Sequence, residues 1–416
     1  MQPIKKIPPA LRWFNRVLLI LIAVLVVVQC ARCSSEDAES SSEKNIKETQ
    51  SLVAEALADS AVDLAATPSA SQTDSAKSQP AKPDLSHVYA QKDTGLARLM
   101  DTFLRRYHPD YAIYLAVDAH TNEIIAWGER KDGAIQSTPD YLSRASFPAA
   151  SLAKTVTIAA AFESKRYSIH TEIPLIGKAH TLYKRQLKIP ENYRGPITPL
   201  HLAFAKSYNA PMALVGMNVG AKHLRSAAEK LGFNRNFSQG IPERSNYSPP
   251  DSGYGLAEVA SGFTKSTTLS PLQAAGIVRA ILMKKSFEIP WEKSGAKGFA
   301  PTQPIALGIE RFSDNTYFGL RQAMVATATE GTARKNISTR NISRKFFADL
   351  EIGGKTGSLD GTDPQGRYDW FMGFAQSRKN PEKSVVLVVL QVHGERRTQA
   401  STLIASLLIN YWAKEK

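Results

Sequence analysis

Three short groups of polar residues in this sequence could together activate a serine hydroxyl. They are Ser151-Leu152-Ala153-Lys154, Ser207-Tyr208-Asn209 and Lys355-Thr356-Gly357-Ser358. A serine hydroxyl is a weak nucleophile and needs a base within hydrogen-bond reach. Residues three apart on a helix share a face, so Lys154 can approach the Ser151 hydroxyl. This spacing predicts nucleophilic catalysis at Ser151, with Lys154 as its base.

Lys154 can act as a base near neutral pH only if its pKa falls. The ordinary lysine pKa is about 10.4, and lowering it to about 7 takes roughly 4.6 kcal/mol at about 1.36 kcal/mol per unit. Burial, a helix N-terminus and a second nearby cation all act in this direction. Lys355 is the candidate second cation.

Each of the three patterns is short enough to recur by chance. Further matches begin at Ser41, Lys293, Ser294 and Ser313. Ser41 lies in a stretch with few apolar residues, and Lys293 and Ser294 lie in a Gly-containing segment where neither a helix nor a strand is expected. Ser313 is expected to be the N-cap of the helix that follows it. Only the groups at 151, 207 and 355 combine a helix start, a turn between helices and a strand.

The hydrophobic pattern around these groups predicts an α+β domain. Alternation predicts a hairpin over Tyr111–Asp118 and Glu123–Arg130, and later strands over Leu350–Ser358, Asp369–Ala375 and Ser384–His393. Helical spacing predicts helices over Leu96–Tyr107, from about Ser151, within 198–232 and 270–285, and from about Thr398. We therefore expect an antiparallel sheet of about five strands from both chain ends, flanked by helices, with a helical insertion.

From about Tyr111 to its end, the chain resembles the transpeptidase domain of penicillin-binding proteins. These enzymes cross-link peptidoglycan and carry S-x-x-K, S-x-N and K-[ST]-G in that order. The intervals here, from 151 to 207 and from 207 to 355, are similar to theirs. So are the flanking segments Val117-Asp118, Gly331-Thr332-Ala333 and Asp369-Trp370-Phe371-Met372-Gly373-Phe374. The resemblance implies a penicillin-binding/β-lactamase-like fold.

The resemblance also implies a role for each candidate residue. Ser207 would link Lys154 to the leaving amine, and Asn209 would hold Lys154 and a substrate amide. The backbone N–H groups of Ser151 and Ser358 would form an oxyanion hole. Lys355, Thr356 and Ser358 would hold the terminal carboxylate of a D-Ala-D-Ala stem peptide. Gly357 would let an extended peptide approach the strand edge closely.

Composition divides the chain into three predicted parts. Residues 1–33 carry basic residues before the apolar run Val17–Val28 and are expected to form a cytoplasmic basic tip and a signal anchor. A cleaved signal peptide and a lipoprotein remain alternatives. Residues 34–88 are rich in Ser, Ala and acidic residues and predict a flexible tether. Residues 89–416 are expected to form the transpeptidase domain, outside the cytoplasm and held at the inner (cytoplasmic) membrane by one span.

The predicted function is a serine D,D-transpeptidase that β-lactams inhibit. A D,D-carboxypeptidase or a β-lactamase would share the acylation step, and a non-catalytic wall-binding scaffold is the alternative from another class. No cofactor or metal is expected, since the eight histidines show no ligand spacing. The formal net charge of +14 suits an anionic polymer, but no nucleic-acid motif is present. Expected partners are peptidoglycan stem peptides, β-lactams, a glycan polymerase and other cell-wall proteins.

Overall fold

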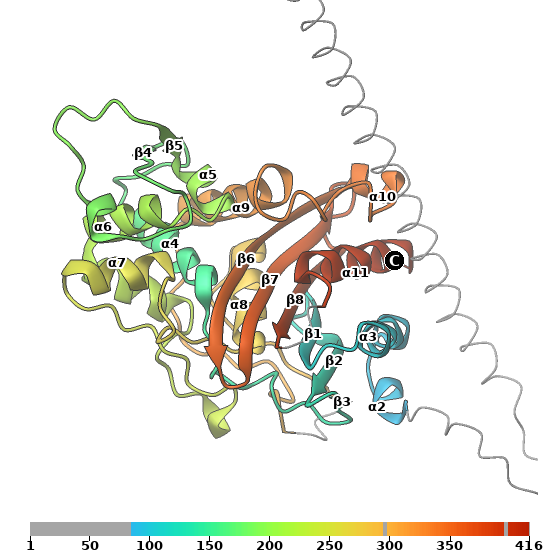
Figure 1. Cartoon of the computed structure of the whole chain (residues 1–416). Helices are drawn as coiled ribbons and strands as arrows, with labels where there is room; N and C mark the ends of the chain where they lie inside the picture. The colour runs from blue at the N-terminus through green and yellow to red at the C-terminus, as the bar shows by residue number, and fades with distance from the viewer. Residues whose placement is uncertain (1–84, 294–297, 395–397, 416) are drawn as a thin grey trace, which may run out of the picture. The chain divides into compact units, whose positions relative to one another are not determined.

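The computed structural model describes residues 85–293, 298–394 and 398–415 (Figure 1). The predicted anchor and nearly all of the predicted tether lie outside the described residues. The first described element is the short helix α2, Ser86–Tyr89. Val88 of this helix is fully buried, so the packed part of the chain begins slightly before the predicted domain start at residue 89.

A six-stranded antiparallel sheet forms the centre of the described chain. Its strands follow the order β3-β2-β1-β8-β7-β6, and segments from both chain ends meet where β1 pairs with β8. The strands are β1 (Tyr111–Asp118), β2 (Ile124–Lys131), β3 (Ala134–Ile135), β6 (Leu350–Thr362), β7 (Gln365–Ser377) and β8 (Ser384–His393). The predicted α+β class and the origin of the sheet are confirmed, and the two-residue β3 adds a strand to the five expected.

The hairpin of β6 and β7 is longer than the sequence pattern predicts. Pairing continues from Leu350 opposite Ser377 to Thr362 opposite Gln365. Polar residues and glycines at the turn end of this hairpin interrupt the apolar alternation on which the strand prediction rests. The turn end of the hairpin borders the site.

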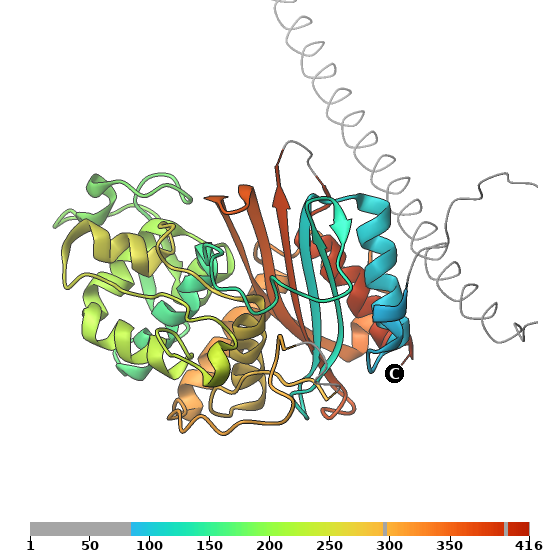
Figure 2. The same ribbon diagram turned by 90° about the horizontal axis from the view of Figure 1, so that it is seen from below.

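Helices cover both faces of the sheet, since successive side chains of each strand point to opposite faces. Phe371 of β7 lies in a core with α3 (Thr94–Tyr107) and α11 (Ser401–Glu415). Trp370 and Met372 point the other way, into a core with the central helices. Figure 2 shows α3 and α11 side by side on one face and the helical insertion on the other side of the sheet.

The helical insertion lies between the two groups of strands in sequence, as predicted. Its helices are α4 (Lys154–Glu163), α5 (Leu200–Ala205), α6 (Asn209–Lys230), α7 (Gly253–Ser261), α8 (Pro271–Met283) and α9 (Asp314–Thr329), and α10 (Arg344–Asp349) follows. Shorter elements are the turns η1 (Ala150–Ala153), η2 (Lys184–Leu187) and η3 (Ser238–Gly240), and the small sheet of β4 (Glu172–Pro174) and β5 (Ile197–Pro199). The Ser313 hydroxyl caps α9, which confirms the predicted N-cap.

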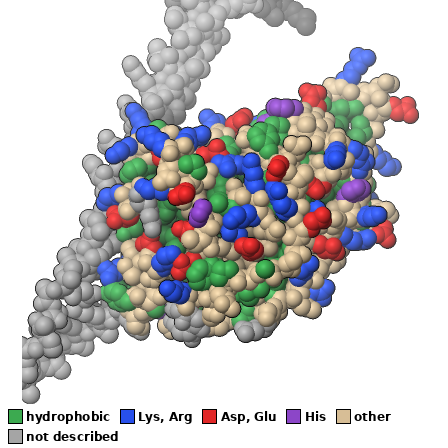
Figure 3. Space-filling model, turned by 180° about the vertical axis from the view of Figure 1, so that it is seen from behind, with side chains coloured by type: hydrophobic (Ala, Val, Ile, Leu, Met, Phe, Trp, Pro, Cys, Tyr) green, Lys and Arg blue, Asp and Glu red, His purple; other side chains and the backbone are tan. Residues whose placement is uncertain are grey.

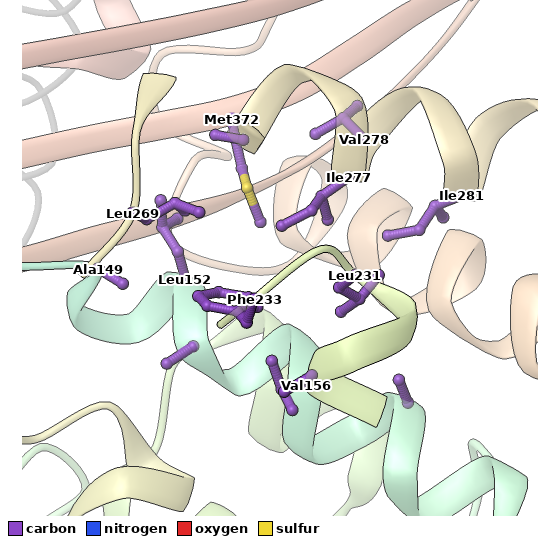
Figure 4. Packing of buried hydrophobic residues seen from close by; sticks show 14 of the residues in the cluster. Ala149, Leu152, Val156, Leu231, Phe233, Leu269, Ile277, Val278, Ile281 and Met372 are labelled. Atoms are coloured by element: carbon purple, nitrogen blue, oxygen red, sulfur yellow. The ribbon is translucent and has the colours of Figure 1, made fainter. Parts of the chain in front are cut away.

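Apolar side chains hold the start of α4 firmly in the core (Figure 4). Leu152 and Val156 are almost fully buried and belong to one core with Phe233, Ile277 and Met372. Because these partners come from α8, from β7 and from the segment after α6, the position of η1 depends on several distant parts of the chain.

Candidate active site

The first polar group lies where η1 meets α4. Ser151 lies within η1, and the regular helix begins at Lys154, three residues after the predicted start. Ala150 has φ 49°, a left-handed conformation that costs a non-glycine residue about 1–3 kcal/mol. Lys154 Nζ lies 2.7 Å from Ser151 Oγ. The predicted approach of these two side chains is therefore present.

The second polar group lies at a break between α5 and α6. The predicted turn between helices is present here, and Ser207 has φ 58° within it. Asn209 begins α6 with its side chain turned toward Lys154, whose Nζ donates to Asn209 Oδ1 at 2.8 Å. The other end of the amide donates to the backbone oxygen of His180 at 2.8 Å. These two contacts together fix the orientation of the Asn209 amide.

The third polar group lies on β6, at the free edge of the sheet. Lys355 Nζ donates to Ser207 Oγ at 3.0 Å and to the backbone oxygen of Thr356 at 2.8 Å. It also lies 5.3 Å from the centre of the Phe204 ring, a cation–π distance. The Lys355 side chain thus connects the sheet edge to the turn that carries Ser207.

Gly357 allows β6 to lie directly against the turn that carries Ser151. A Cβ atom at this position would lie 3.2 Å from the backbone oxygen of Ala149 and 3.3 Å from Leu152 Cγ. Both distances are shorter than ordinary van der Waals contacts. Glycine therefore permits the close approach of strand and turn. Its predicted role in admitting an extended peptide, and the predicted N–H donors of an oxyanion hole, stay predictions.

Lys154 has contacts that suit a neutral amine. Its Nζ lies within hydrogen-bond distance of Asn209 Oδ1 and, at 2.6 Å, of the Ser261 backbone oxygen. Both are acceptors only, so they take two N–H bonds, and the third direction points to Ser151 Oγ. A neutral amine has two donors and one lone pair, which leaves the lone pair for the Ser151 hydroxyl proton.

Burial shifts the pKa values of both lysines in the direction that this chemistry needs. The two side chains are fully buried. Desolvation, and secondly the charge of Lys355, hold the pKa of Lys154 well below its ordinary value. Desolvation lowers the pKa of Lys355 to about 7. Lys154 can thus be neutral while Lys355 still carries part of its charge near neutral pH.

A cleft of about 540 Å³ opens above these contacts. Six of the eight predicted residues line it, namely Ser151, Ser207, Asn209, Thr356, Gly357 and Ser358. The other two, Lys154 and Lys355, lie buried beside it. The structure therefore brings all eight predicted residues together.

Sequence reasoning missed several residues that line or support this cleft. They include His180, Ser261, Gly262, Phe263, Asp360 and Arg367. No local pattern points to them, because they come from loops, helix ends and a strand end. Thr332, quoted above only as a flanking residue, bonds through its hydroxyl to the hydroxyl of Thr356.

Two further properties of the described residues bear on the predictions. Within the described ranges, His, Cys, Asp and Glu form no group of three that could hold a metal ion. Over the same ranges, every helix is too short or too polar to cross a lipid bilayer. Figure 3 shows one face, on which Lys and Arg side chains are spread among Asp and Glu side chains.

Residues 112–408 match the sequence family described as penicillin binding protein transpeptidase domain. The chain belongs to this family. The predicted family resemblance is confirmed, and the match includes all three polar groups.

Two relatives with low sequence identity to this chain are named as enzymes or proteins of this family. The chain is 24% identical over 302 residues to peptidoglycan D,D-transpeptidase PbpA of Mycobacterium tuberculosis. This match covers 66% of this chain and 56% of the relative. It is 28% identical over 273 residues to penicillin-binding protein 1B of Vibrio cholerae, over 63% of this chain and 31% of the relative. The chain thus matches little more than half the length of the first relative and less of the second.

Solved structures share the fold. Penicillin-binding protein A from M. tuberculosis, as a ceftriaxone acyl-enzyme complex, superposes with a TM-score of 0.56 at 20% identity, over 76% of this chain and 78% of that one. The transpeptidase domain of the FtsI4 D,D-transpeptidase from Legionella pneumophila gives 0.50 at 18% identity, over 80% and 99%.

Proposed function

We propose that this protein is a peptidoglycan D,D-transpeptidase with Ser151 as its nucleophile. The observation that carries the proposal is the environment of Lys154 Nζ, which is buried, bonded to two acceptors and directed at Ser151 Oγ. This arrangement lets a lysine take a hydroxyl proton at neutral pH. The family match and the names of the relatives support peptidoglycan as the substrate.

The first half of the reaction forms an acyl-enzyme. Ser151 Oγ attacks the carbonyl carbon of the penultimate D-Ala of a stem peptide while its proton passes to Lys154 Nζ. The C–N bond to the terminal D-Ala then breaks. Lys154 is proposed to return this proton to the leaving nitrogen by way of the Ser207 hydroxyl, which also accepts a hydrogen bond from Lys355 Nζ at 3.0 Å. Terminal D-Ala leaves as a free amino acid.

The second half transfers the acyl group. An amine of a neighbouring stem attacks the ester carbonyl, a new amide bond forms, and the C–O bond to Ser151 breaks. The amine loses a proton to Lys154, and Ser151 recovers one. Attack by water instead would give the carboxypeptidase or β-lactamase alternative, since both share the acylation step.

Ser151 and Ser358 are proposed to stabilise the oxyanion of each tetrahedral intermediate through their backbone N–H groups. Removing one such donor costs about 3–4 kcal/mol in other enzymes. Lys355, Thr356 and Ser358 are proposed to bind the carboxylate of the terminal D-Ala, which β-lactams mimic. The exposed Ser358 and the half-buried Thr356 line the cleft and can reach such a group.

We also propose that the protein acts outside the cytoplasm, held at the inner membrane by residues 1–33. The support is the basic flank and apolar run of the sequence. A glycan polymerase partner is proposed on the resemblance alone. Protease digestion of intact spheroplasts tests the location, because an extracytoplasmic domain is degraded while a cytoplasmic marker survives.

Labelling with a fluorescent penicillin tests the nucleophile. We expect the full-length chain to form a covalent adduct and Ser151→Ala to form none, because the ester bond requires that hydroxyl. Ser41→Ala is the matched control, since Ser41 also precedes a lysine by three residues. It should label like the wild type. Undiminished labelling of Ser151→Ala would contradict the proposal and favour a scaffold role with adventitious labelling.

Incubation of the adduct separates the alternatives. A transpeptidase holds the penicilloyl group and transfers a stem peptide to an added amine such as a D-amino acid. Mass spectrometry follows the acyl-enzyme over time. Rapid release of hydrolysed penicillin would instead identify a β-lactamase.

A further inference from the structure

A pair of opposite charges lies at the turn end of the β6–β7 hairpin, within the cleft that contains Ser151. Asp360 and Arg367 are directly opposite in the register of the two strands. Arg367 Nη1 donates to Asp360 Oδ1 at 3.3 Å, and both side chains line the cleft. The Asp360 side chain is 69% exposed and the Arg367 side chain is 57% exposed. Both charges can therefore be reached by a molecule bound there.

The direction of a bound stem peptide follows from the site geometry. The acylated carbonyl must lie at Ser151, whose turn contacts β6 at Gly357. The lysine end of the motif, at Lys355, is the end that would hold the terminal carboxylate. The stem residues before the scissile bond must then extend the other way along the sheet edge, past Ser358 and toward Asp360.

The distance along β6 from Gly357 to Asp360 is long enough for the acylated D-Ala and the one stem residue before it. Asp360 is three residues beyond Gly357, roughly 10 Å along an extended strand. The acylated D-Ala occupies the nearer part of this length, and the third stem residue with its side chain reaches the rest. The charged pair thus lies where the third side chain would end.

Asp369 also lines the cleft, but it is already engaged. Its Oδ2 accepts from the backbone N–H of Ser401 at 2.8 Å, at the start of α11, and lies 3.7 Å from His393 Nε2. A carboxylate at a helix N-terminus is a stabilising contact. Near the turn end of the hairpin, Asp360 and Arg367 are therefore the charged residues of the cleft lining that a ligand can use.

We propose that Asp360 and Arg367 form a subsite for a stem peptide whose third side chain ends in a zwitterionic amino-acid group, as in diaminopimelic acid. The proposal rests on the proposed function. Arg367 would bind the carboxylate through paired N–H donors, and Asp360 would bind the ammonium. An exposed ion pair contributes little to stability, so each of the two side chains can replace its partner with a ligand charge at little cost.

A side chain that ends in a lone amine, as in lysine, fits this pair less well. It would satisfy Asp360 but would place a second cation beside Arg367 without a carboxylate for it. The pair should therefore distinguish the two common kinds of stem. A pair that only joins the strands of the hairpin would stabilise the fold equally but would not distinguish stems.

The test compares release of D-Ala from two pentapeptide donors that differ only in the third residue, diaminopimelate or lysine. Rates are measured for the full-length wild type and for Arg367→Gln, Arg367→Lys, Asp360→Asn and Asp251→Asn. Each kcat/KM is divided by the penicillin acylation rate of the same variant, which removes effects on the nucleophile. Asp251 forms an exposed ion pair with Arg225 and does not line the cleft, so it is the matched control.

We expect the wild type to prefer the diaminopimelate donor by about tenfold, the size of one charge-assisted hydrogen bond. Arg367→Gln should abolish this preference, Arg367→Lys should retain part of it, and Asp360→Asn should slow both donors. Asp251→Asn should behave as the wild type. Equal rates on both donors in the wild type, or an unchanged preference in Arg367→Gln, would overturn the subsite. Absence of any penicillin adduct in the wild type would instead overturn the proposed function.

Discussion

At the scale of single residues, the proposed chemistry depends on whether each of the two buried lysine amines is protonated or neutral. Lys154 and Lys355 are both fully buried, and neither forms an ion pair with a carboxylate among the contacts described. Desolvation acts on both, and the charge of Lys355 acts further on Lys154. In the proposed mechanism the two lysines therefore divide the work: Lys154 accepts a proton, and Lys355 supplies positive charge.

The pH dependence of penicillin acylation should show both lysines. Acylation should rise with pH as Lys154 loses its proton, at a pH well below the ordinary lysine pKa. It should fall above a pH of about 7, where Lys355 loses the charge that attracts the carboxylate of penicillin. Second-order acylation rates measured from acid through alkaline pH record both limbs.

Lys355→Arg separates the two effects. A guanidinium keeps its proton throughout this range, so the alkaline limb should move to higher pH even if the overall rate drops. An alkaline limb at the same pH in Lys355→Arg and in the wild type would show that Lys355 does not cause it.

At the scale of elements, a helix end supports the base. Helix α7 ends at Ser261 and is followed by Gly262, which has φ 63°; the Ser261 carbonyl accepts a hydrogen bond from Lys154. A Cβ atom at Gly262 would lie only 2.1 Å from the backbone oxygen of Ala150. Glycine at this position thus permits the helix end, the base and the nucleophile turn to lie against one another.

Gly262→Ala tests this arrangement. We expect penicillin acylation to fall at least tenfold, because the turn that carries Ser151 must move, and roughly 1 kcal/mol of backbone strain is added. Gly308→Ala is the matched control, since Gly308 has φ 62° and a Cβ atom there would meet no other atom within 4 Å. It should carry the strain without losing acylation. Equal acylation by the two variants would contradict this account.

At the scale of the whole described domain, the sheet joins segments from both chain ends, and side chains complete its bonding. Gln91 is buried, and its side-chain amide bonds to both backbone groups of Trp127 in β2, donating to the oxygen at 3.0 Å and accepting from the N–H at 2.6 Å. The Gln91 amide thus makes the hydrogen bonds that a neighbouring strand would make to β2, at a position that β3 does not pair with. The segment before α3 is therefore tied to the sheet through the Gln91 side chain.

Gln91→Ala should destabilise the domain without altering its chemistry. It leaves the Trp127 N–H and carbonyl without these partners, at a cost of about 1–3 kcal/mol per unsatisfied group. Thermal unfolding should shift down by several degrees while the penicillin acylation rate stays within twofold. Gln136→Ala is the control, because its side-chain amide bonds to the nearby backbone oxygen of Ala134 at the surface. Equal melting temperatures of the two variants would argue against this role.

Much of the site and fold could be predicted from the sequence because the signals are local. A serine and a lysine three residues apart need only one turn of helix to meet, and alternation over a few residues is enough to indicate a strand such as Ser384–His393. The Ser313 cap likewise depends on the four residues around it. Such patterns are fixed by backbone geometry within one element.

Tertiary structure alone decided the features that depend on contacts between distant segments. The carbonyl of Ser261 reaches Lys154 across 107 residues, and Asn209 reaches it across 55. The charged pair at the hairpin end follows from strand register, which no single segment specifies. The sequence by itself thus determined the candidate reacting groups, and the fold determined the pKa shifts of the two lysines and what surrounds them, because burial is a property of the assembled chain.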